Sequence, residues 1–150
     1  MGSIPTWGSM DMKIHKTAAV VVEKDGKFLL IKRPERQSDP GKWAIPGGHV
    51  EDGEPVHITA QREMQEEVGG VDSDSLEQVG QPFMHDVLGP RTGPHQHVCH
   101  AFRAKKSDEP VVDPNEAADW AWFRPEDIRR LDLTVHSERI LKDLKIIDSK

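Results

Sequence analysis

The sequence of 150 residues contains a single cysteine, Cys99, no tyrosine and no long hydrophobic run. One cysteine excludes an internal disulfide and favours a reducing, cytoplasmic location. No apolar stretch approaches the ~20 residues that a membrane-spanning helix needs, so we expect no membrane partner. Positive charge is not in excess either, because the formal net charge is −6. This balance argues against a stable nucleic-acid partner held by charge.

What is present is typical of a folded domain. Hydrophobic residues make up 35% of the chain and charged residues 31%, and the length is that of one domain. Residues 1–9 are interpreted as a remnant of cloning, because a Gly-Ser pair precedes Met10; a natural flexible terminus is the alternative. We therefore expect a single domain over residues 10–150, either as a monomer or as a homodimer.

Two apolar runs at the start of the chain predict a β-hairpin. Residues 17–23 and 27–33 are rich in β-branched and large apolar side chains, and Asp25-Gly26 lies between them. Asp-Gly between apolar runs is a strong signal for a tight hairpin turn. Further strands are predicted at residues 81–88, 97–104 and 119–123. Residues 43–45 form a short apolar run, which Pro46-Gly47-Gly48 ends.

The clearest helix is predicted over residues 55–68. Pro55 suits the first helical position, and Gly69-Gly70 suits the end. Apolar residues recur about every four positions between them, as on the buried face of a helix. A short helix is expected over residues 125–131 and another over 137–147. Strands mixed with helices predict an α/β or α+β sandwich, with helices flanking a mixed sheet.

Three glutamates on the predicted helix point to metal chemistry. The spacing of Glu63, Glu66 and Glu67 places their carboxylates on one helix face, where like charges repel. A bound cation would relieve that repulsion, and oxygen ligands favour Mg²⁺ or Mn²⁺ over zinc. Mg²⁺ usually takes its remaining ligands from water and substrate phosphates, so the cluster indicates phosphate chemistry. The alternative is a solvated acidic helix face.

The residues around these glutamates favour the metal site. Gly48, Glu54 and the run Arg62 to Gly69 (REMQEEVG) resemble the signature of the Nudix hydrolases, G-x5-E-x7-R-E-U-x-E-E-x-G-U, where U is a bulky aliphatic residue. The last position departs from it, because Gly70 stands there and Val71 follows. A shift of one residue at the helix end would let Val71 fill the aliphatic position. Similarity of this kind covers most of residues 16–131. It implies an α/β/α sandwich that hydrolyses a nucleoside diphosphate linked to another moiety, X.

The resemblance also implies roles for individual residues. Glu66 and Glu67 resemble the main metal ligands, and Glu63 a further ligand or the base that activates water. The resemblance leaves open which glutamate is the base. The Gly48 carbonyl resembles a backbone metal ligand, and Glu116, near the closing strand, a further metal ligand. Glu54 and Arg62 resemble a salt bridge between the glycine loop and the catalytic helix.

Substrate contacts are expected outside the signature. Arg33 stands where family members often contact a phosphate, and a surface arginine is the alternative. Trp43 and Trp120 are candidates for stacking on a base, with core packing as the alternative, and Asp119 for binding a base edge. His97 is expected to line the pocket.

The run GPHQHVCH also raises the possibility of a zinc site. Its spacing does not place His95, His97 and His100 on one strand face, which argues against zinc. Cys99 is expected to be a small buried hydrophobe.

The absence of tyrosine argues against a dinucleoside polyphosphate hydrolase, a subgroup that often carries one. The proline that often marks ADP-ribose hydrolases is displaced here. A nucleoside triphosphate or a damaged nucleotide remains as the expected substrate. Two alternatives stay open: an ADP-ribose or nucleotide-sugar pyrophosphatase, and a non-catalytic nucleotide-binding sensor.

Overall fold

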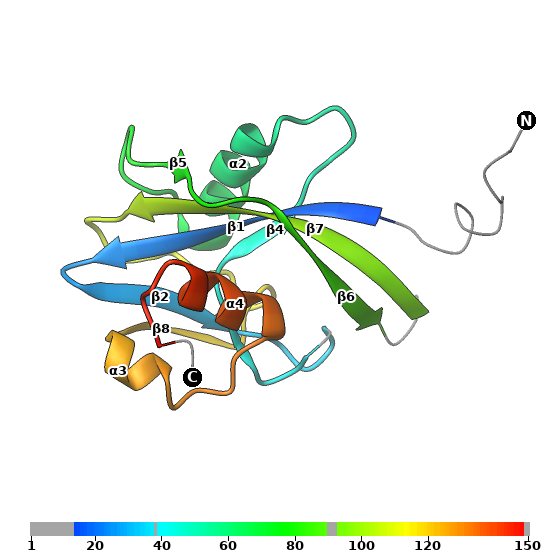
Figure 1. Ribbon diagram of the computed structural model, residues 1–150. Coiled ribbons are helices and arrows are strands. Elements are labelled where there is room, and N and C mark those ends of the chain that lie inside the picture. The colour runs from blue at the N-terminus through cyan, green and yellow to red at the C-terminus, as the bar shows by residue number, and fades with distance from the viewer. Residues whose placement is uncertain (1–13, 38, 90–92, 149–150) are drawn as a thin grey trace, which may run out of the picture.

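The computed structural model describes residues 14–37, 39–89 and 93–148, so the interpretation of residues 1–9 lies outside the described residues. The elements follow one another as a mixture of strands and helices (Figure 1). In chain order they are β1 (Ile14–Lys24), β2 (Lys27–Lys32), β3 (Trp43–Ala44), β4 (Gly47–His49), α2 (Val56–Val68), β5 (Glu77–Gln78), β6 (Phe83–Gly89), β7 (Gly93–Lys105), β8 (Asp119–Phe123), α3 (Pro125–Ile128) and α4 (Val135–Asp143).

Strand β1 is the centre of the sheet. It pairs in parallel with β7 along ten successive residue pairs, Ile14–Glu23 with Gln96–Lys105. Its other edge pairs antiparallel with β4 and, beyond it, with β2. Strand β2 continues the sheet to β3 and β8, and β7 continues it to β5 and β6. The sheet is therefore mixed, as the sequence predicts.

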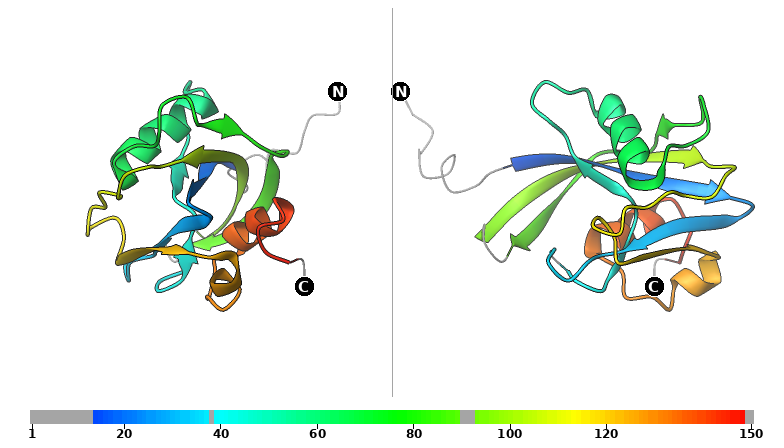
Figure 2. Two further views of the ribbon diagram at one scale, coloured as in Figure 1. Left: turned by 90° about the vertical axis from the view of Figure 1, so that its left-hand side faces the viewer. Right: turned by 180° about the vertical axis from the view of Figure 1, so that it is seen from behind.

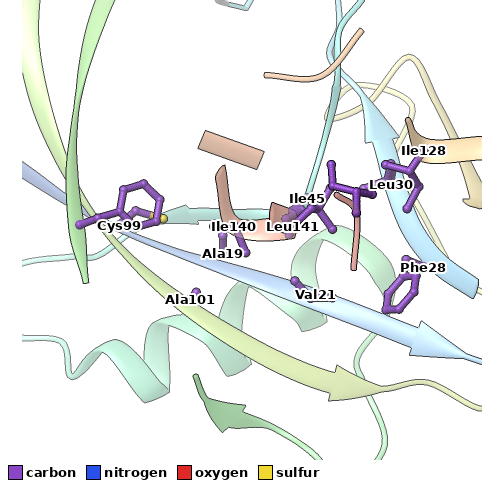
Figure 3. Close-up of a cluster of buried hydrophobic side chains, with 12 residues drawn as sticks. Ala19, Val21, Phe28, Leu30, Ile45, Cys99, Ala101, Ile128, Ile140 and Leu141 are labelled. Atoms are coloured by element: carbon purple, nitrogen blue, oxygen red, sulfur yellow. The ribbon is translucent and has the colours of Figure 1, made fainter. Parts of the chain in front are cut away.

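Alternate side chains of β1 enter two separate cores. Ala19 and Val21 belong to the first core, which α3 and α4 cover with Ile128, Ile140 and Leu141 (Figure 3). Ala18, Val20 and Val22 belong to the second core, which α2 covers with the side chains of Ala60, Met64 and Val68. Helix α2 and the pair α3 and α4 thus lie on opposite faces of the sheet (Figure 2). This arrangement confirms the predicted α/β/α sandwich.

Strong local signals in the sequence place several elements correctly. Asp25 and Gly26 form the two-residue hairpin turn with positive φ angles of 52° and 77°, as Asp-Gly predicts. Helix α2 runs from Val56 to Val68 and ends at Gly69 in the left-handed region. Cys99 is fully buried, as expected. No helix in the part of the chain that the structure describes is long and apolar enough to cross a membrane.

Other boundaries differ from the sequence predictions. Helix α4 begins earlier and ends at Asp143, because the chain turns at Lys145 with a φ of 60°. Ile147 lies beyond the helix and still packs into the first core. Helix α3 ends at Ile128, not at residue 131. Strands β4 and β5 were not anticipated, since neither Gly-Gly-His nor Glu-Gln carries an apolar strand pattern.

Helix α4 is tied to the strand segment that leads to the glycine loop. Ile45 N–H donates to Ser137 Oγ at 2.9 Å, and Thr134 Oγ1 donates to the same oxygen at 2.7 Å. Both Ser137 and Thr134 are buried. A buried backbone donor needs a partner, so Ser137 fixes where the chain leaves β3 toward β4.

Replacing Ser137 tests this tether. Ser137→Ala would leave the Ile45 N–H buried without its acceptor, and we expect the free energy of unfolding to fall by ~1–3 kcal/mol. Urea denaturation measures the change, with Ser73→Ala at an exposed turn as the control. A loss no larger for Ser137→Ala than for the control would contradict the tether.

Candidate active site

The glycine loop passes through a space too narrow for a side chain. A Cβ atom on Gly47 would lie 2.1 Å from the carbonyl oxygen of Ala18, and one on Gly48 would lie 2.2 Å from Cδ of Glu63. The bare backbone therefore lies between β1 and α2 in direct reach of the helix glutamates. Gly47 N–H donates to Glu67 Oε1 at 2.7 Å.

Arg62 donates hydrogen bonds to three of the glutamates of the signature. Its Nη1 donates to Glu63 at 2.9 Å and to Glu66 at 3.2 Å. Its Nε and Nη2 form a two-pronged pair with Glu54 at 2.9 and 3.0 Å, and Nη2 also donates to the His49 carbonyl oxygen at 3.0 Å. A planar guanidinium can serve several acceptors in fixed geometry, whereas a lysine cannot. The ion pair expected between Glu54 and Arg62 is thus present.

Thr59 supports this pair and was missed by the sequence reasoning. It is fully buried, and its Oγ1 donates to Glu54 Oε1 at 2.7 Å. Glu51 N–H donates to the same oxygen at 3.1 Å. The hydrogen bonds from Arg62, then Thr59 and Glu51, lower the pKa of Glu54 to about 2. A threonine inside a helix carries no signal for such a role, because its partner is fixed only by the fold.

Glu63 and Glu67 are held in an environment that disfavours their charge. Burial raises the pKa of Glu67 to about 8, although the Gly47 hydrogen bond opposes this, and Glu63 and Glu116 raise it further. Burial is also the main cause that raises the pKa of Glu63, with Glu66 and Glu116 adding to it and Arg62 opposing it. Glu116, on the turn before β8, is therefore close enough to act electrostatically on both helix glutamates.

The residues fit a hard divalent cation in their chemistry. Glu63 lies against Gly48 and Glu67 accepts the Gly47 N–H, while Glu66 and Glu116 act on Glu63 electrostatically. Oxygen ligands of this kind suit Mg²⁺ or Mn²⁺. Burial, and after it the neighbouring carboxylates, raises the pKa values of Glu63 and Glu67, and a bound cation would oppose both causes. Among residues 14–37, 39–89 and 93–148, no three histidine, cysteine or carboxylate side chains are arranged to hold a metal ion as they stand. Glu63 and Glu66 instead face Arg62.

The backbone explains why glycine, and not an aliphatic residue, occupies the last position of the signature. Gly70 has a φ of 95°, in the left-handed region that an aliphatic side chain avoids, and a Cβ there would meet Gln65 Oε1 at 2.9 Å. Val71 packs against the second core. The aliphatic contact is therefore shifted by one residue, as the sequence suggests.

Arg33 directly follows β2 and is coupled electrostatically to one of the helix glutamates. Burial lowers the pKa of its guanidinium, while the charges of Asp39 and Glu67 raise it. The charge of Arg33 therefore acts on Glu67, one of the expected metal ligands, and the phosphate contact stays a prediction.

The other predicted substrate residues divide between the two faces of the sheet. Trp43 packs edge-to-face on Phe123 with ring centroids 5.0 Å apart and belongs to the first core. Lys32 lies over Trp43, with Nζ 6.0 Å from the ring centroid, and Asp119 is its cross-strand partner on β8. Trp120 packs against the second core, beneath α2. The structure therefore brings Trp43 and Asp119 to one face and places Trp120 on the other.

His97 lies in a cluster that the sequence did not reveal. We name His15, His49 and His97 the histidine cluster: their rings contact one another edge-on, with centroids 5.2–5.9 Å apart. They come from β1, β4 and β7, and His15 pairs with His97 in the parallel ladder. His15 alternates with Thr17 and Ala19, so the cluster shares the face of the first core. His100 instead contacts Gln78 and lies on the opposite face of β7 from His97; the side chain of His95 lies outside the described residues.

Comparison with known proteins identifies the family. The NUDIX domain family matches residues 13–144, so this chain belongs to the Nudix family and is a hydrolase of pyrophosphate bonds. It is 30% identical over 138 residues to Nucleoside triphosphatase NudI of Escherichia coli K12, a match that covers 87% of this chain and 96% of that protein. The NudI of Escherichia fergusonii is 29% identical over 137 residues, with the same coverage. Hydrolases of this family generally need divalent metal ions.

Solved structures agree with this assignment. The MutT NUDIX hydrolase of Burkholderia pseudomallei superposes with a TM-score of 0.67 at 28% identity, covering 87% of this chain and 97% of that one. The MutT protein of Bacillus halodurans gives the same TM-score at 23% identity, covering 85% and 80%. At that identity the second likeness supports the fold alone.

The buried Glu67 predicts how stability changes with pH in metal-free protein. Its pKa of about 8 in the fold exceeds the ordinary value of 4.5, so the folded state binds more protons between these values. The free energy of unfolding should therefore fall as pH rises from 5 to 9, by up to ~4 kcal/mol from this group.

Urea denaturation in EDTA at several pH values measures this effect. Glu67→Gln should remove most of the decline, because the amide has no proton to lose. Glu126→Gln, at an exposed position on α3, is the control and should keep the slope of the wild type. Equal slopes for Glu67→Gln and the wild type would show that Glu67 is ionised in the fold across this range.

Proposed function

We propose that this protein hydrolyses nucleoside triphosphates, intact or damaged, with Mg²⁺ or Mn²⁺ as the cofactor. The observation that carries the proposal is the close packing of Glu63 and Glu67 on the glycine loop. Glu66, Glu116 and Arg33 are coupled electrostatically to these two glutamates. The similarity to proteins named Nucleoside triphosphatase NudI over most of both chains supports the choice of substrate.

In this proposal the glutamates hold the metal together with a carbonyl oxygen of the glycine loop. Glu66 is 59% exposed and paired only weakly with Arg62, so its carboxylate is free to turn toward a cation. When bound, the metal orients and activates water and offsets the negative charge that develops on the phosphate oxygens. Arg33 contributes a second cation for the phosphates. Arg62 holds Glu63 while its pairing with Glu54 fixes the loop against the helix.

The setting of the reaction is part of the same proposal. The single cysteine supports a cytoplasmic location, and the net negative charge opposes nucleic acid as a stable partner. The substrate is then a small nucleotide whose charge is offset by the bound metal. Monomer and homodimer are equally compatible with this chemistry.

Replacing a single glutamate tests the metal role. Glu66→Gln keeps the size of the side chain but removes the charge that would hold the cation, and we expect turnover to fall by at least ~100-fold. Turnover of nucleoside triphosphates is measured with Mg²⁺, with Mn²⁺ and with EDTA, alongside the melting temperature. The folded state should persist or gain stability, because removing one charge relieves carboxylate repulsion.

Glu126→Gln provides the matched control and should retain wild-type turnover in both metals. Undiminished turnover of the wild type in EDTA would overturn the metal mechanism. Nucleotide binding without turnover under any condition would instead favour the nucleotide-binding sensor. Hydrolysis of ADP-ribose or a nucleotide sugar in preference to triphosphates would favour the pyrophosphatase alternative.

We further propose that the face of the first core recognises the moiety that distinguishes one substrate from another. Two sets of side chains lie on this face. One is the histidine cluster, and the other consists of Lys32, Trp43 and Asp119. His49 directly follows Gly48, so the cluster adjoins the loop that would hold the metal. Imidazole rings offer both hydrogen-bonding nitrogens and flat faces for a planar group. Trp120, on the other face, is assigned to packing.

Substitutions on the two faces of one strand test this division. His97→Ala should change the ratio of kcat/KM between purine and pyrimidine triphosphates by about five-fold, since one lost hydrogen bond is worth ~1 kcal/mol. His100→Ala, on the opposite face of β7, should leave the ratio unchanged. Trp120→Ala should lower the melting temperature and leave the ratio unchanged. Equal ratios for His97→Ala and the wild type would place recognition elsewhere.

A further inference from the structure

The catalytic helix ends without a cation of its own. The last turn of α2 carries no basic residue, yet it contains Glu66 and Glu67. The carbonyl end of a helix already bears partial negative charge. The end of α2 therefore carries negative charge from its carbonyl groups and from these two glutamates. Arg62, one turn earlier, pairs with Glu66, and a further cation at the helix end would offset the partial charge of the carbonyl groups.

Lys106 is that cation. Its Nζ donates to the Gly70 carbonyl oxygen at 2.6 Å, two residues beyond the helix, and pairs with Asp108 at 2.9 Å. Its side chain is only 2% exposed. Among the residues that the structure describes, Lys106 is the only charged residue that is buried. Burying an ammonium group costs free energy that partners must offset. A methionine would fill a similar space without that cost.

The other end of Lys106 is fixed to the sheet. It directly follows β7, and its N–H donates to the Glu23 carbonyl oxygen at the end of β1, at 3.1 Å. The side chain therefore links the strand pair β1 and β7 to the helix end. Gly69 and Gly70, with φ angles of 84° and 95°, form the turn that brings the Gly70 carbonyl into reach.

We propose that Lys106 is a positioning residue for the catalytic glutamates, acting through the Gly70 carbonyl. The 2.7 Å contact from Gly47 N–H to Glu67 requires α2 to lie at one depth on the sheet. Arg62 fixes the first half of the helix against the loop, and Lys106 fixes the last turn. Without the ammonium group the last turn loosens, and Glu66 and Glu67 lose their fixed positions. The inference rests on the proposed metal role of these glutamates.

Lys106→Met tests the proposal, because it removes the charge and retains most of the volume. Lys24→Met is the matched control: Lys24 also forms a 3.0 Å ion pair, with Glu109, but does not contact the helix end. In metal-free protein, hydrogen exchange at the last turn of α2 should accelerate at least ten-fold in Lys106→Met alone. Mn²⁺ affinity, measured by electron paramagnetic resonance of free Mn²⁺, should fall about five-fold or more.

Kinetics separate positioning from a general loss of stability. At subsaturating Mn²⁺ the kcat of Lys106→Met should fall, and saturating Mn²⁺ should restore most of it, with the KM for nucleotide nearly unchanged. A folded variant with wild-type exchange and wild-type Mn²⁺ affinity would overturn the role of Lys106. If the wild type itself binds no Mn²⁺, the proposed function fails, while the exchange measurement still decides whether Lys106 holds the helix end. Should Lys106→Met not fold, Lys106→Gln, which keeps a donor without charge, is measured in the same way.

Discussion

The site depends on how closely the backbone of Gly47 and Gly48 passes between β1 and α2. Side chains at these positions would collide with the Ala18 carbonyl oxygen and with Glu63. Because the loop is bare, the helix lies near enough for Glu67 to accept the Gly47 N–H and for Arg62 to reach the His49 carbonyl oxygen. The small residues Ala18 and Ala19 on β1, opposite Gly48 and Gly47, allow the same close approach from the other side.

This approach has an energetic consequence. The close approach places Glu67 where burial disfavours its charge, so the pKa of Glu67 rises. Hydrogen bonds from Arg62 and Thr59 lower the pKa of Glu54. Two glutamates of one motif thus have opposite environments. Glu54 is stabilised as a structural anion, and Glu67 is held in a state that a cation would relieve. Functional sites commonly depart in this way from what stability alone would favour.

The sequence predicts the elements that local patterns determine, and it misses the contacts that arise only when those elements pack together. The Asp25-Gly26 turn, strand β1 and helix α2 follow from short-range signals, and the signature places the glutamates on one helix face. Strand β4 has no pattern of its own and exists because β1 offers it an edge. Lys106 and Thr59 find partners 36 and 5 residues away. Such partners follow from the packing of α2 on the sheet, which no spacing rule contains.

Strand register also decides between interpretations that the sequence leaves equal. Trp43 and Trp120 carry the same aromatic signal, but β3 and β8 turn them to opposite faces of the sheet. His97 and His100 separate in the same way on β7. Strand β4 then joins the two faces: a side chain at Gly48 would meet Glu63 beneath α2, whereas the ring of the next residue, His49, contacts His15 and His97. The backbone of β4 pairs with β1 along one edge, and along the other edge Gly47 N–H and the His49 carbonyl oxygen contact Glu67 and Arg62 of α2. In the proposed function, phosphate chemistry and recognition therefore occupy opposite faces of one three-residue strand.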